Sequence, residues 1–356
     1  MKPLAFALMT CVLVACSVQS GEHSSKREPD PVSADTLHPV KTTFPQVHTN
    51  LGGRVREFVR TIHHDTRGHY WFGTNGSGLI RYDGHVLETL ALPFGTAFVA
   101  VRGIAEAPNG HLWFATSEGV LRYDGEDFTA FSLRDGLPDT EVWSIRATAD
   151  GTVWIGTLSG TCRFSDGKFT TFQLPNELVD DRDAMLSYDL AGGFLEDTQG
   201  NIWINHDGNG IFRYRDGAFI HLTAENGLTD NFSGAALLDR SGRIWLSSFY
   251  GGVSMYDGAD FTHFTRDGAV KGEEVGGFCE DRNGHIWFTA EGYGGYRYDG
   301  DGFTLYTAAD GLASDLVLGI FCDRNGLLWF STWQGLSVYD GVRFADAAEL
   351  VPWLGE

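Results

Sequence analysis

The chain has 356 residues and a formal net charge of −21, with 13% aromatic residues and 46 glycines. This length allows one large domain with a well-buried core. The acidic balance argues against broad nucleic-acid binding, which needs a basic surface, and against docking on anionic lipid. Abundant glycine and aromatic residues are typical of short strands joined by tight turns.

The chain begins with the pattern of an export signal. Lys2 precedes an apolar run over residues 4–14, too short for a membrane-spanning helix. The run ends in Leu13-Val14-Ala15-Cys16, which resembles a bacterial lipobox, so we expect a signal peptide over 1–15 and a lipid on Cys16. An ordinary signal peptide cut nearby is the alternative. The resemblance to lipoprotein sorting signals, with Ser17 in place of the Asp of inner-membrane retention, implies an outer-membrane lipoprotein facing the periplasm or the surface.

The next segment, residues 16–41, is polar and contains three prolines. It carries too little apolar surface to order itself, so we expect a lipidated cysteine followed by a disordered tether. The membrane would then be reached through the lipid anchor only. Residues 42–356 remain for the folded domain.

That domain is built from an internal repeat marked by tryptophan. Successive marker tryptophans are 42, 41, 49, 42, 42 and 42 residues apart, and a glycine lies three residues before each. A repeat of about 40 residues with strand-like content indicates a propeller or solenoid. The markers are Trp71, Trp113, Trp154, Trp203, Trp245, Trp287 and Trp329.

Each repeat contains four strand-like pieces, seen in the second repeat at residues 99–106, 111–116, 120–124 and 128–133. We call them A to D, from the axis outward. One four-stranded sheet cannot bury both faces, whereas seven in a ring cover one another. The sequence therefore predicts an all-β fold, a seven-bladed β-propeller of four-stranded antiparallel blades, with each marker tryptophan in the gap between neighbouring blades.

Aspartates recur at two turns of the repeat. The A–B turn reads Asp-x-x-Gly, as in Asp65 to Gly68, and the C–D turn reads Asp-Gly, as in Asp166-Gly167. Asp-Gly at the centre of a hairpin favours a type I′ turn. Because the C–D turn aspartate recurs in every blade, a structural role is preferred over a calcium site.

Two further expectations concern cysteines and ring closure. Cys279 and Cys322 lie eight and seven residues before their marker tryptophans, which predicts opposite faces of neighbouring strands and buried free thiols. Either chain end resembles an outer strand for the last blade, at residues 42–47 or 341–344. We expect the N-terminal segment to contribute.

The repeat resembles the two-component regulator propeller repeat. The signature is present as Asp135-Gly-Leu-Pro138, Val142-Trp-Ser-Ile145 and Gly151-Thr-Val-Trp154, and it recurs from Asp310 to Gly341. The resemblance covers residues 45–350 and implies a seven-bladed propeller. In that family such propellers often form the periplasmic sensing part of a hybrid sensor kinase. No kinase segment is recognised in this chain, which leaves a sensing or binding module.

Positions that vary among the repeats are candidates for function. The B–C and D–A loops share one face around the channel mouth, and three residues after the marker tryptophan six blades carry a small residue while the fourth carries His206. Eleven residues before it, three adjacent blades carry bulky groups and the next three carry glycine. Aromatic side chains beside polar groups suit sugar rings. The candidate ligand-binding residues are Arg60, Arg102, Trp143, His206, Asp207, Phe249, Tyr250, Tyr293 and Trp333.

Alternatives stay open for these residues. The aromatic side chains could pack on neighbouring loops, and Arg60 and Arg102 could pair with Glu57, Glu106 or Glu141 instead of an acidic ligand such as a uronate. A seven-residue insertion before the fourth blade, containing Asp180, Asp181 and Asp183, reads as a solvated acidic loop, with a lid or a calcium site as the alternative.

Catalysis is not indicated by any motif. Streptogramin lyases share the blade strand seen at Trp287-Phe288-Thr289, but their catalytic Glu-x-His pair does not occur here. We expect no metal and no cofactor. The sequence favours a lipid-anchored propeller that binds a carbohydrate or another envelope component at its mouth. The alternatives are a polysaccharide lyase with His206 or Tyr250 as base, and a protein scaffold in outer-membrane assembly, with an envelope protein as partner.

Overall fold

The computed structural model describes residues 59–95, 98–175, 186–187, 189–272, 274–290 and 292–347. The chain divides into two compact units, Met1–Leu37 and His38–Glu356, and the described residues all belong to the second. The expected signal peptide, Cys16, the tether and the insertion over 176–185 lie outside the described residues. Within those ranges, no helix combines the length and apolar character that crossing a membrane requires.

Twenty-eight strands occur in the described residues, and all their ladder pairings are antiparallel. Blade one comprises β1 (Val59–His64), β2 (Tyr70–Gly76), β3 (Leu79–Tyr82) and β4 (Leu87–Leu90). Blade two comprises β5 (Val99–Glu106), β6 (Leu112–Thr116), β7 (Gly119–Tyr123) and β8 (Phe128–Phe131). Blade three comprises β9 (Val142–Ala147), β10 (Val153–Thr157), β11 (Gly160–Ser165) and β12 (Lys168–Phe172). Blade four comprises β13 (Ala191–Glu196), β14 (Ile202–His206), β15 (Gly210–Arg215) and β16 (Ala218–Leu222).

The last three blades repeat this order. Blade five comprises β17 (Ser233–Leu238), β18 (Ile244–Ser248), β19 (Gly252–Tyr256) and β20 (Phe261–His263). Blade six comprises β21 (Val275–Glu280), β22 (Ile286–Ala290), β23 (Gly294–Tyr298) and β24 (Phe303–Tyr306). Blade seven comprises β25 (Val317–Cys322), β26 (Leu328–Thr332), β27 (Gly335–Tyr339) and β28 (Phe344–Asp346). Short 3₁₀ turns precede three blades, at Leu133–Asp135, Ala224–Asn226 and Ala308–Asp310.

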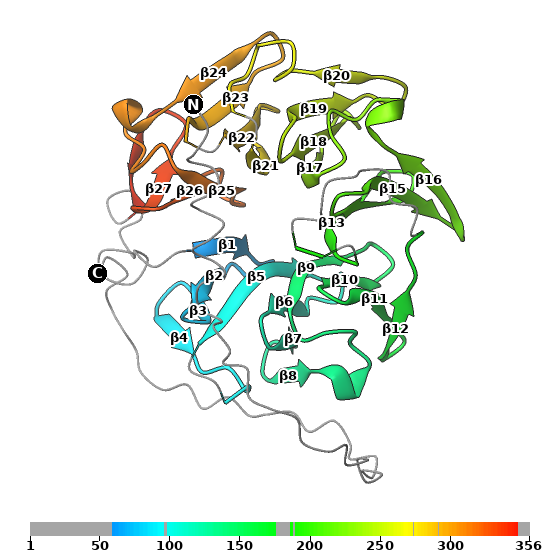
Figure 1. Cartoon of the computed structure of the whole chain (residues 1–356). Helices are drawn as coiled ribbons and strands as arrows, with labels where there is room; N and C mark the ends of the chain where they lie inside the picture. Colours follow the sequence, from blue (N-terminus) through cyan, green and yellow to red (C-terminus); the bar gives the residue numbers. More distant parts are fainter. Residues whose placement is uncertain are drawn as a thin grey trace, which may run out of the picture. The chain divides into compact units, whose positions relative to one another are not determined.

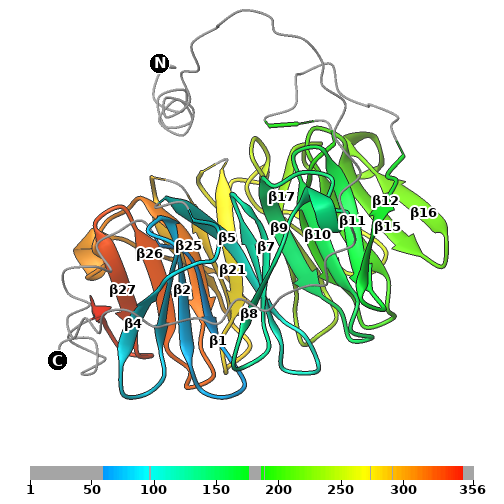
Figure 2. The same cartoon turned by 90° about the horizontal axis from the view of Figure 1, so that it is seen from below.

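The inner strands follow one another around a ring. Each contacts the inner strand of the next blade in the order β1, β5, β9, β13, β17, β21 and β25, and β25 contacts β1 again. Figure 1 views this ring down its central axis, and Figure 2 shows it from the side with the blades next to one another. Five blades are separate four-stranded sheets, whereas blades one and two are joined through β2 and β5. The predicted fold class is therefore confirmed.

The marker tryptophans lie between blades, as predicted. All seven are between 0% and 3% exposed. Trp71 packs on Phe114 of the next blade at 5.4 Å between ring centroids, and Trp329 closes the series on Tyr70 of blade one at 5.5 Å. Burying a side chain of this size stabilises the fold by about 2–3 kcal/mol, so the repeated tryptophan supplies much of the contact between blades.

The A–B turn aspartate holds both its own turn and its tryptophan. In blade seven, one carboxylate oxygen of Asp323 accepts the N–H groups of Asn325 and Leu327 at 2.8 and 2.9 Å. The other oxygen accepts the indole N–H of Trp329 at 3.1 Å and the hydroxyl of Tyr70 at 2.7 Å. Asp65, Asp197, Asp239 and Asp281 bond their marker tryptophans in the same way. The recurrent aspartate thus has a structural role.

The C–D turns differ from the prediction. A two-residue turn with positive φ at both residues occurs at Asp166-Gly167 (φ 51° and 77°) and at Asp216-Gly217 (φ 49° and 86°). The other five turns have four residues, as between Tyr82 and Leu87. In these turns the aspartate side chain accepts two backbone N–H groups, as Asp83 does from His85 and Val86. A type I′ turn is therefore the wrong prediction for those five blades.

Adjacent blades are also linked on the A–B turn face. The turn residue after the aspartate position donates its N–H to the side chain seven residues before the next marker tryptophan: Thr66 to Glu106, Ala149 to Glu196, Arg240 to Glu280 and Arg324 to His64. We call each such bond a turn clasp. The clasp from Arg324 to His64 joins the last blade to the first, so it contributes to ring closure.

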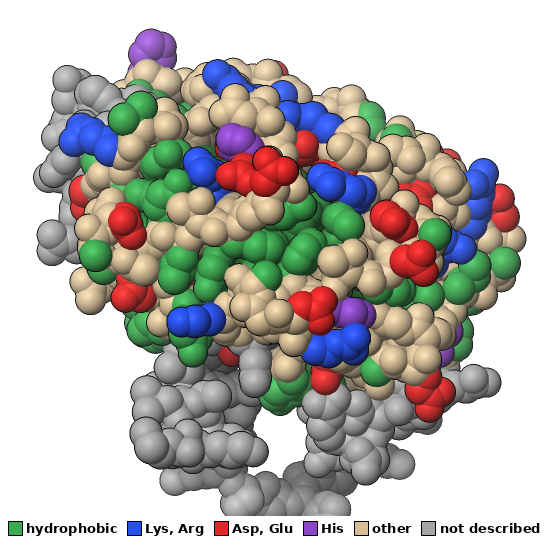
Figure 3. Space-filling view, turned by 90° about the horizontal axis from the view of Figure 1, so that it is seen from above, with side chains coloured by type: hydrophobic (Ala, Val, Ile, Leu, Met, Phe, Trp, Pro, Cys, Tyr) green, Lys and Arg blue, Asp and Glu red, His purple; other side chains and the backbone are tan. Residues whose placement is uncertain are grey.

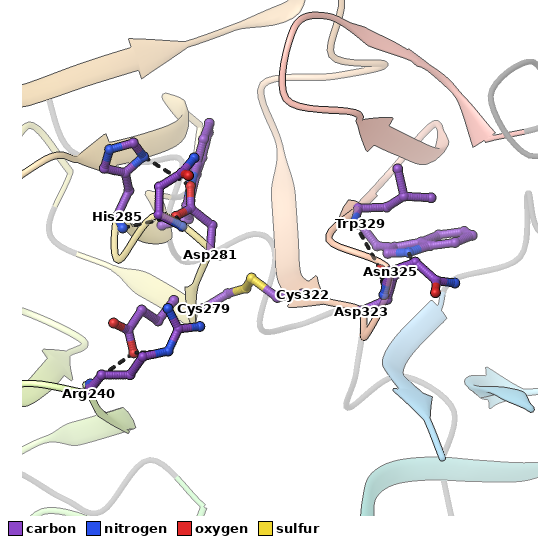
Figure 4. Close-up of a disulfide and its surroundings, with 12 residues drawn as sticks. Arg240, Cys279, Asp281, His285, Cys322, Asp323, Asn325 and Trp329 are labelled. Atoms are coloured by element: carbon purple, nitrogen blue, oxygen red, sulfur yellow. Dashed lines mark hydrogen bonds and ion pairs between the residues drawn. A yellow bond between two sulfur atoms is a disulfide. The ribbon is translucent and has the colours of Figure 1, made fainter. Parts of the chain in front are cut away.

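Blades six and seven are joined covalently at the same level. Cys279 and Cys322 form a disulfide with their Cα atoms 5.8 Å apart (Figure 4). Cys279 pairs with Trp287 in its ladder and Cys322 pairs with Leu328, so the two side chains leave opposite faces of their own sheets. Because stacked blades face one another through opposite faces, this placement brings the sulfurs together. The prediction of free thiols for these two residues is wrong. Among the described residues, Cys162 is the free cysteine, and it is buried.

The C-terminal segment completes blade seven. β28 pairs with β27, with Tyr339 opposite Phe344, and it occupies the outermost position of that blade. The expected contribution of residues 42–47 lies outside the described residues.

Candidate functional site

A cavity of about 580 Å³ lies where the inner strands of blades two to six converge. Its lining includes Arg102 and Trp143 from one side and Phe249 from another. Between them, β13, the start of β17 and β21 contribute Gly192, Gly234 and Gly276. A Cβ atom at Gly192 would meet only the carbonyl oxygen of Asn205, at 3.9 Å. The cavity is therefore open beside Gly192, whereas a Cβ atom at Gly234 or Gly276 would meet the hydroxyl of Ser247 at 2.6 Å or of Thr289 at 2.5 Å.

The side of this cavity opposite the glycines is formed by Arg102 and Trp143, whose side chains pack on each other. Arg102 forms an ion pair with Glu141 at 2.7 Å and donates to the carbonyl of Val142 at 3.2 Å. Its guanidinium carbon lies 4.3 Å from the centroid of the Trp143 ring, within the range of a cation–π contact. The structure thus realises the ion-pair alternative for Arg102, with Glu141 as the partner.

Arg60 approaches the same tryptophan from β1. Its guanidinium carbon lies 5.8 Å from the centroid of the Trp143 ring, and the side chain lines a neighbouring cavity of about 330 Å³ with Leu318 and Ser331. Burial and the nearby charge of Arg102 lower the pKa of Arg60 to about 10, and Glu141 opposes this shift. Arg60, Arg102 and Trp143, which occupy equivalent positions eleven residues before the marker tryptophan, therefore lie together in the structure.

Three predicted aromatic residues lie at the surface of the B–C loops. Tyr250, Tyr293 and Trp333 are 49%, 45% and 47% exposed, and they follow the B strands of three consecutive blades. Tyr250 also packs edge-on against the buried Phe232, with ring centroids 5.4 Å apart. The group presents aromatic surface to solvent, as a ligand platform requires.

His206 is not on this rim. It ends β14 and is 1% exposed, with its ring edge-on to Phe212 at 5.7 Å. In four other blades this position is a threonine whose hydroxyl donates to a carbonyl at the start of the C strand, at 2.7–2.9 Å. Within the described part of the chain, neither ring nitrogen of His206 meets a partner in normal hydrogen-bond geometry, and the nearest polar group is the backbone of Asp207. Burial lowers the pKa of His206, and the charge of Asp207 partly opposes this. The expected exposed position of His206 is corrected, because the side chain fills the threonine position inside the blade.

Asp207 is also buried, at 8% exposure, and binds the chain that follows the insertion. Its carboxylate accepts the N–H groups of Leu186 at 2.7 Å and Ser187 at 3.2 Å. This carboxylate fixes a loop, so the predicted rim contact of Asp207 is corrected as well.

Arg146 was missed by the sequence reasoning although it lies inside the channel. It lines the 580 Å³ cavity and a second cavity of about 750 Å³ toward the A–B turn face. In the other six blades, the position eight residues before the marker tryptophan is occupied by His63, Ala105, Leu195, Leu237, Cys279 and Phe321. A lone arginine in an inner-strand column was the signal that could have identified it.

The described ranges contain no cluster of three or more His, Cys, Asp or Glu side chains placed to hold a metal ion. The charged groups of the channel are instead arginines and their acidic partners. The arrangement can therefore bind a ligand through stacking, charge and hydrogen bonds.

Comparison with known proteins agrees with this architecture. The family model described as two component regulator propeller matches residues 136–159 and 311–334. These segments contain the inner strand and the second strand of blades three and seven. Comparison with curated protein sequences gave no match.

Several solved structures share the fold. A streptogramin B lyase superposes with a TM-score of 0.63 at 16% identity, over 79% of this chain and 93% of that one. A catalytically inactive virginiamycin B lyase from Staphylococcus aureus with quinupristin gives 0.63 at 14% identity, over 85% and 97%. PorZ, a surface component of the type-IX secretion system of Porphyromonas gingivalis, gives 0.61 at 18% identity, over 83% of this chain and 48% of PorZ.

At such identities the similarity establishes the fold and nothing further about activity. The repeat match and the blade geometry point the same way. The chain is a β-propeller that carries two component regulator propeller repeats.

Proposed function

We propose that this protein is an extracytoplasmic, lipid-anchored propeller that binds a carbohydrate or another cell-envelope component at the mouth of its channel. The observation that carries the proposal is the 580 Å³ cavity, which combines the Arg102–Trp143 stack with an open glycine-lined side. Its volume lies in the range of small-ligand pockets. The half-exposed aromatic residues of blades five to seven supply stacking surface on the loops.

The extracytoplasmic location has independent support. The disulfide between Cys279 and Cys322 is a bond that persists in oxidising compartments and is rare in the cytosol. The Leu13-Val14-Ala15-Cys16 sequence supports a lipid anchor. Changing Cys16 to Ser should move the protein from the membrane fraction to the soluble fraction. An unchanged membrane fraction for Cys16→Ser would rule out the anchor at this residue.

Binding is tested by a thermal-shift screen of the full chain against neutral and acidic oligosaccharides, with each mixture checked for chain cleavage. A saturable shift without cleavage is the expected result. Gly192→Leu should then abolish the shift, because a side chain at this open position fills the cavity without a backbone clash. Binding that survives in Gly192→Leu would show that the ligand does not enter the channel.

The polysaccharide-lyase alternative is weakened by the interior position of His206. A general base must come within hydrogen-bonding distance of the substrate proton, and a side chain with 1% exposure does not reach the mouth. Cleavage in the same screen would restore this alternative, with Tyr250 as the remaining base candidate.

One observation favours the scaffold alternative. On the side of the ring where β24 lies in Figure 1, hydrophobic side chains gather between basic and acidic ones (Figure 3). Exposed apolar surface of this kind marks protein contacts in many proteins. If no oligosaccharide causes a thermal shift and the anchored chain captures an envelope protein, the scaffold is favoured over ligand binding.

A further inference from the structure

The far end of the channel contains a second cavity that the proposed function does not use. It has a volume of about 750 Å³ and lies on the A–B turn face, between the inner strands and turns of blades two and three. Its lining comes chiefly from residues 104–110 and 145–149. Because the candidate ligand site is at the other end, this cavity needs its own explanation.

The cavity lies at one of three blade junctions without a turn clasp in the described residues; the other two have Leu238 and the disulfide-bonded Cys322 at the acceptor position. Four other blade junctions have a backbone N–H that donates to an acceptor side chain of the next blade, as in Ala149 to Glu196. Between blades two and three the donor position is Pro108, which has no N–H, and the acceptor position is Ala147, which has only a methyl group. Both halves of the clasp are absent together, and the space that it would fill is open.

The lining is basic although the chain is acidic. Arg67, Arg146 and Arg324 line the cavity, and Glu106 is the acidic residue among the lining residues. The Glu106 carboxylate is already bonded, to the N–H of Thr66 at 3.1 Å and to the Arg324 guanidinium at 3.6 Å. It also pairs with His63 at 3.3 Å. A ligand in the cavity therefore meets more free positive than negative charge.

Arg146 is the cation best placed to receive an anion. No hydrogen bond or ion pair from its side chain occurs within the described part of the chain, and the side chain is exposed into the channel. Glu196 is the acidic group that acts on it electrostatically, and that carboxylate is occupied by the N–H of Ala149 at 2.8 Å. Arg67 is anchored from outside the cavity, where it donates to the carbonyl of Asp124 at 3.2 Å.

We propose that this turn-face cavity is a second binding site, which takes a compact oxyanion ligand bearing carboxylate or phosphate groups, held by Arg146 and Arg67. Guanidinium groups bind such oxyanions through paired, charge-assisted hydrogen bonds. Carboxylate ligands and phosphate ligands share this chemistry, and the experiment below distinguishes between them.

The test is isothermal titration of the full chain with citrate, with inorganic phosphate and, as a neutral probe, with glycerol. Saturable binding of citrate or phosphate is expected, and the tighter of the two identifies the source. Arg146→Gln should weaken binding by about tenfold or more, since it removes a charged hydrogen-bond donor. Ala147→Glu should abolish it, because the new carboxylate competes for the same cations.

Two controls keep the result specific. Arg266→Gln changes the net charge equally at an exposed position outside the cavity, and it should bind as the unchanged chain does. Arg67→Gln, a surface change that leaves the inner strands intact, should weaken binding by several-fold. The proposal is overturned if neither anion binds saturably, if Arg266→Gln loses binding equally, or if Arg67→Gln and Arg146→Gln both bind normally. Gly192→Leu separates the two sites, since it closes the other cavity alone.

Discussion

The two faces of this propeller differ in how closely equivalent positions of the blades resemble one another. On the A–B turn face, five of the seven blades have an aspartate that bonds its marker tryptophan, and a turn clasp or a disulfide joins five of the seven pairs of neighbouring blades. On the B–C face, equivalent positions hold Asp207, Phe249 and Trp333 in different blades. Repetition on one face holds the ring, which leaves the other face free to vary.

The largest effect is expected from Asp323→Ala on the repeated face. This buried carboxylate receives four hydrogen bonds, including those from Trp329 and Tyr70 across the ring closure. Removing it leaves buried donors without a partner and should cost about 3 kcal/mol or more. Chemical denaturation should show the lower midpoint. As a control, Asp340→Ala at an exposed C–D turn should shift it much less; equal shifts would contradict a special role for the A–B turn.

The disulfide should come next. Replacing Cys279 and Cys322 together by alanine removes a cross-link across 43 residues of sequence. Such a link typically contributes about 2–4 kcal/mol. Thermal unfolding of the double variant should match that of the reduced parent chain. If reduction leaves the melting temperature unchanged, the bond does not contribute to holding blades six and seven together.

A smaller effect of opposite sign is expected at His206, which lies inside blade four at the B–C end of β14. His206→Thr restores the residue of four other blades and its hydroxyl bond to the next strand, so stability should rise by about 1 kcal/mol. Because burial lowers the pKa of His206, protonation opposes folding. Its destabilising contribution therefore grows as the pH falls below the ordinary histidine value.

The pH dependence gives the second readout for the same variant. The melting temperature of the parent chain should fall on acidification from neutral pH, and His206→Thr should fall less. His64→Ala is not an equivalent control, since it also removes the acceptor of a turn clasp. A parallel decrease in both proteins would assign the acid sensitivity to other groups, such as His63 and His64, whose pKa values are also lowered by burial.

Much of the fold follows from the sequence, because the marker tryptophans and their turn aspartates repeat at a fixed spacing. The sequence reasoning missed one contact between blades and the length of most C–D turns. The faces of Cys279 and Cys322 were assigned correctly, yet the disulfide was missed, because stacking brings opposite faces of neighbouring sheets together. The C–D turn lengths were missed because an Asp-Gly pair occurs both in two-residue and in four-residue turns.

The candidate site was predicted in part for a related reason. Column comparison identified Arg60, Arg102 and Trp143, which the structure brings together at the channel. It treated His206 as exposed because a histidine among small residues looks like a loop group, whereas the blade encloses it. It passed over Arg146 because that column was not compared. Inner strands border the channel, so an arginine that is unique at its inner-strand position is a candidate channel residue.

The smallest effect on stability, and the sharpest separation of the two faces, is expected from Trp333→Ala combined with Tyr250→Ala. Both side chains are about half exposed, so their loss should change stability by within about 0.5 kcal/mol each. If the B–C face binds the ligand, the thermal shift caused by an oligosaccharide should nevertheless disappear. The contact of Tyr250 with Phe232 sets the competing outcome. If instead the double variant loses nearly as much stability as Asp323→Ala and still binds the oligosaccharide, these aromatic residues support the fold. The ligand would then bind in the channel without contacting them.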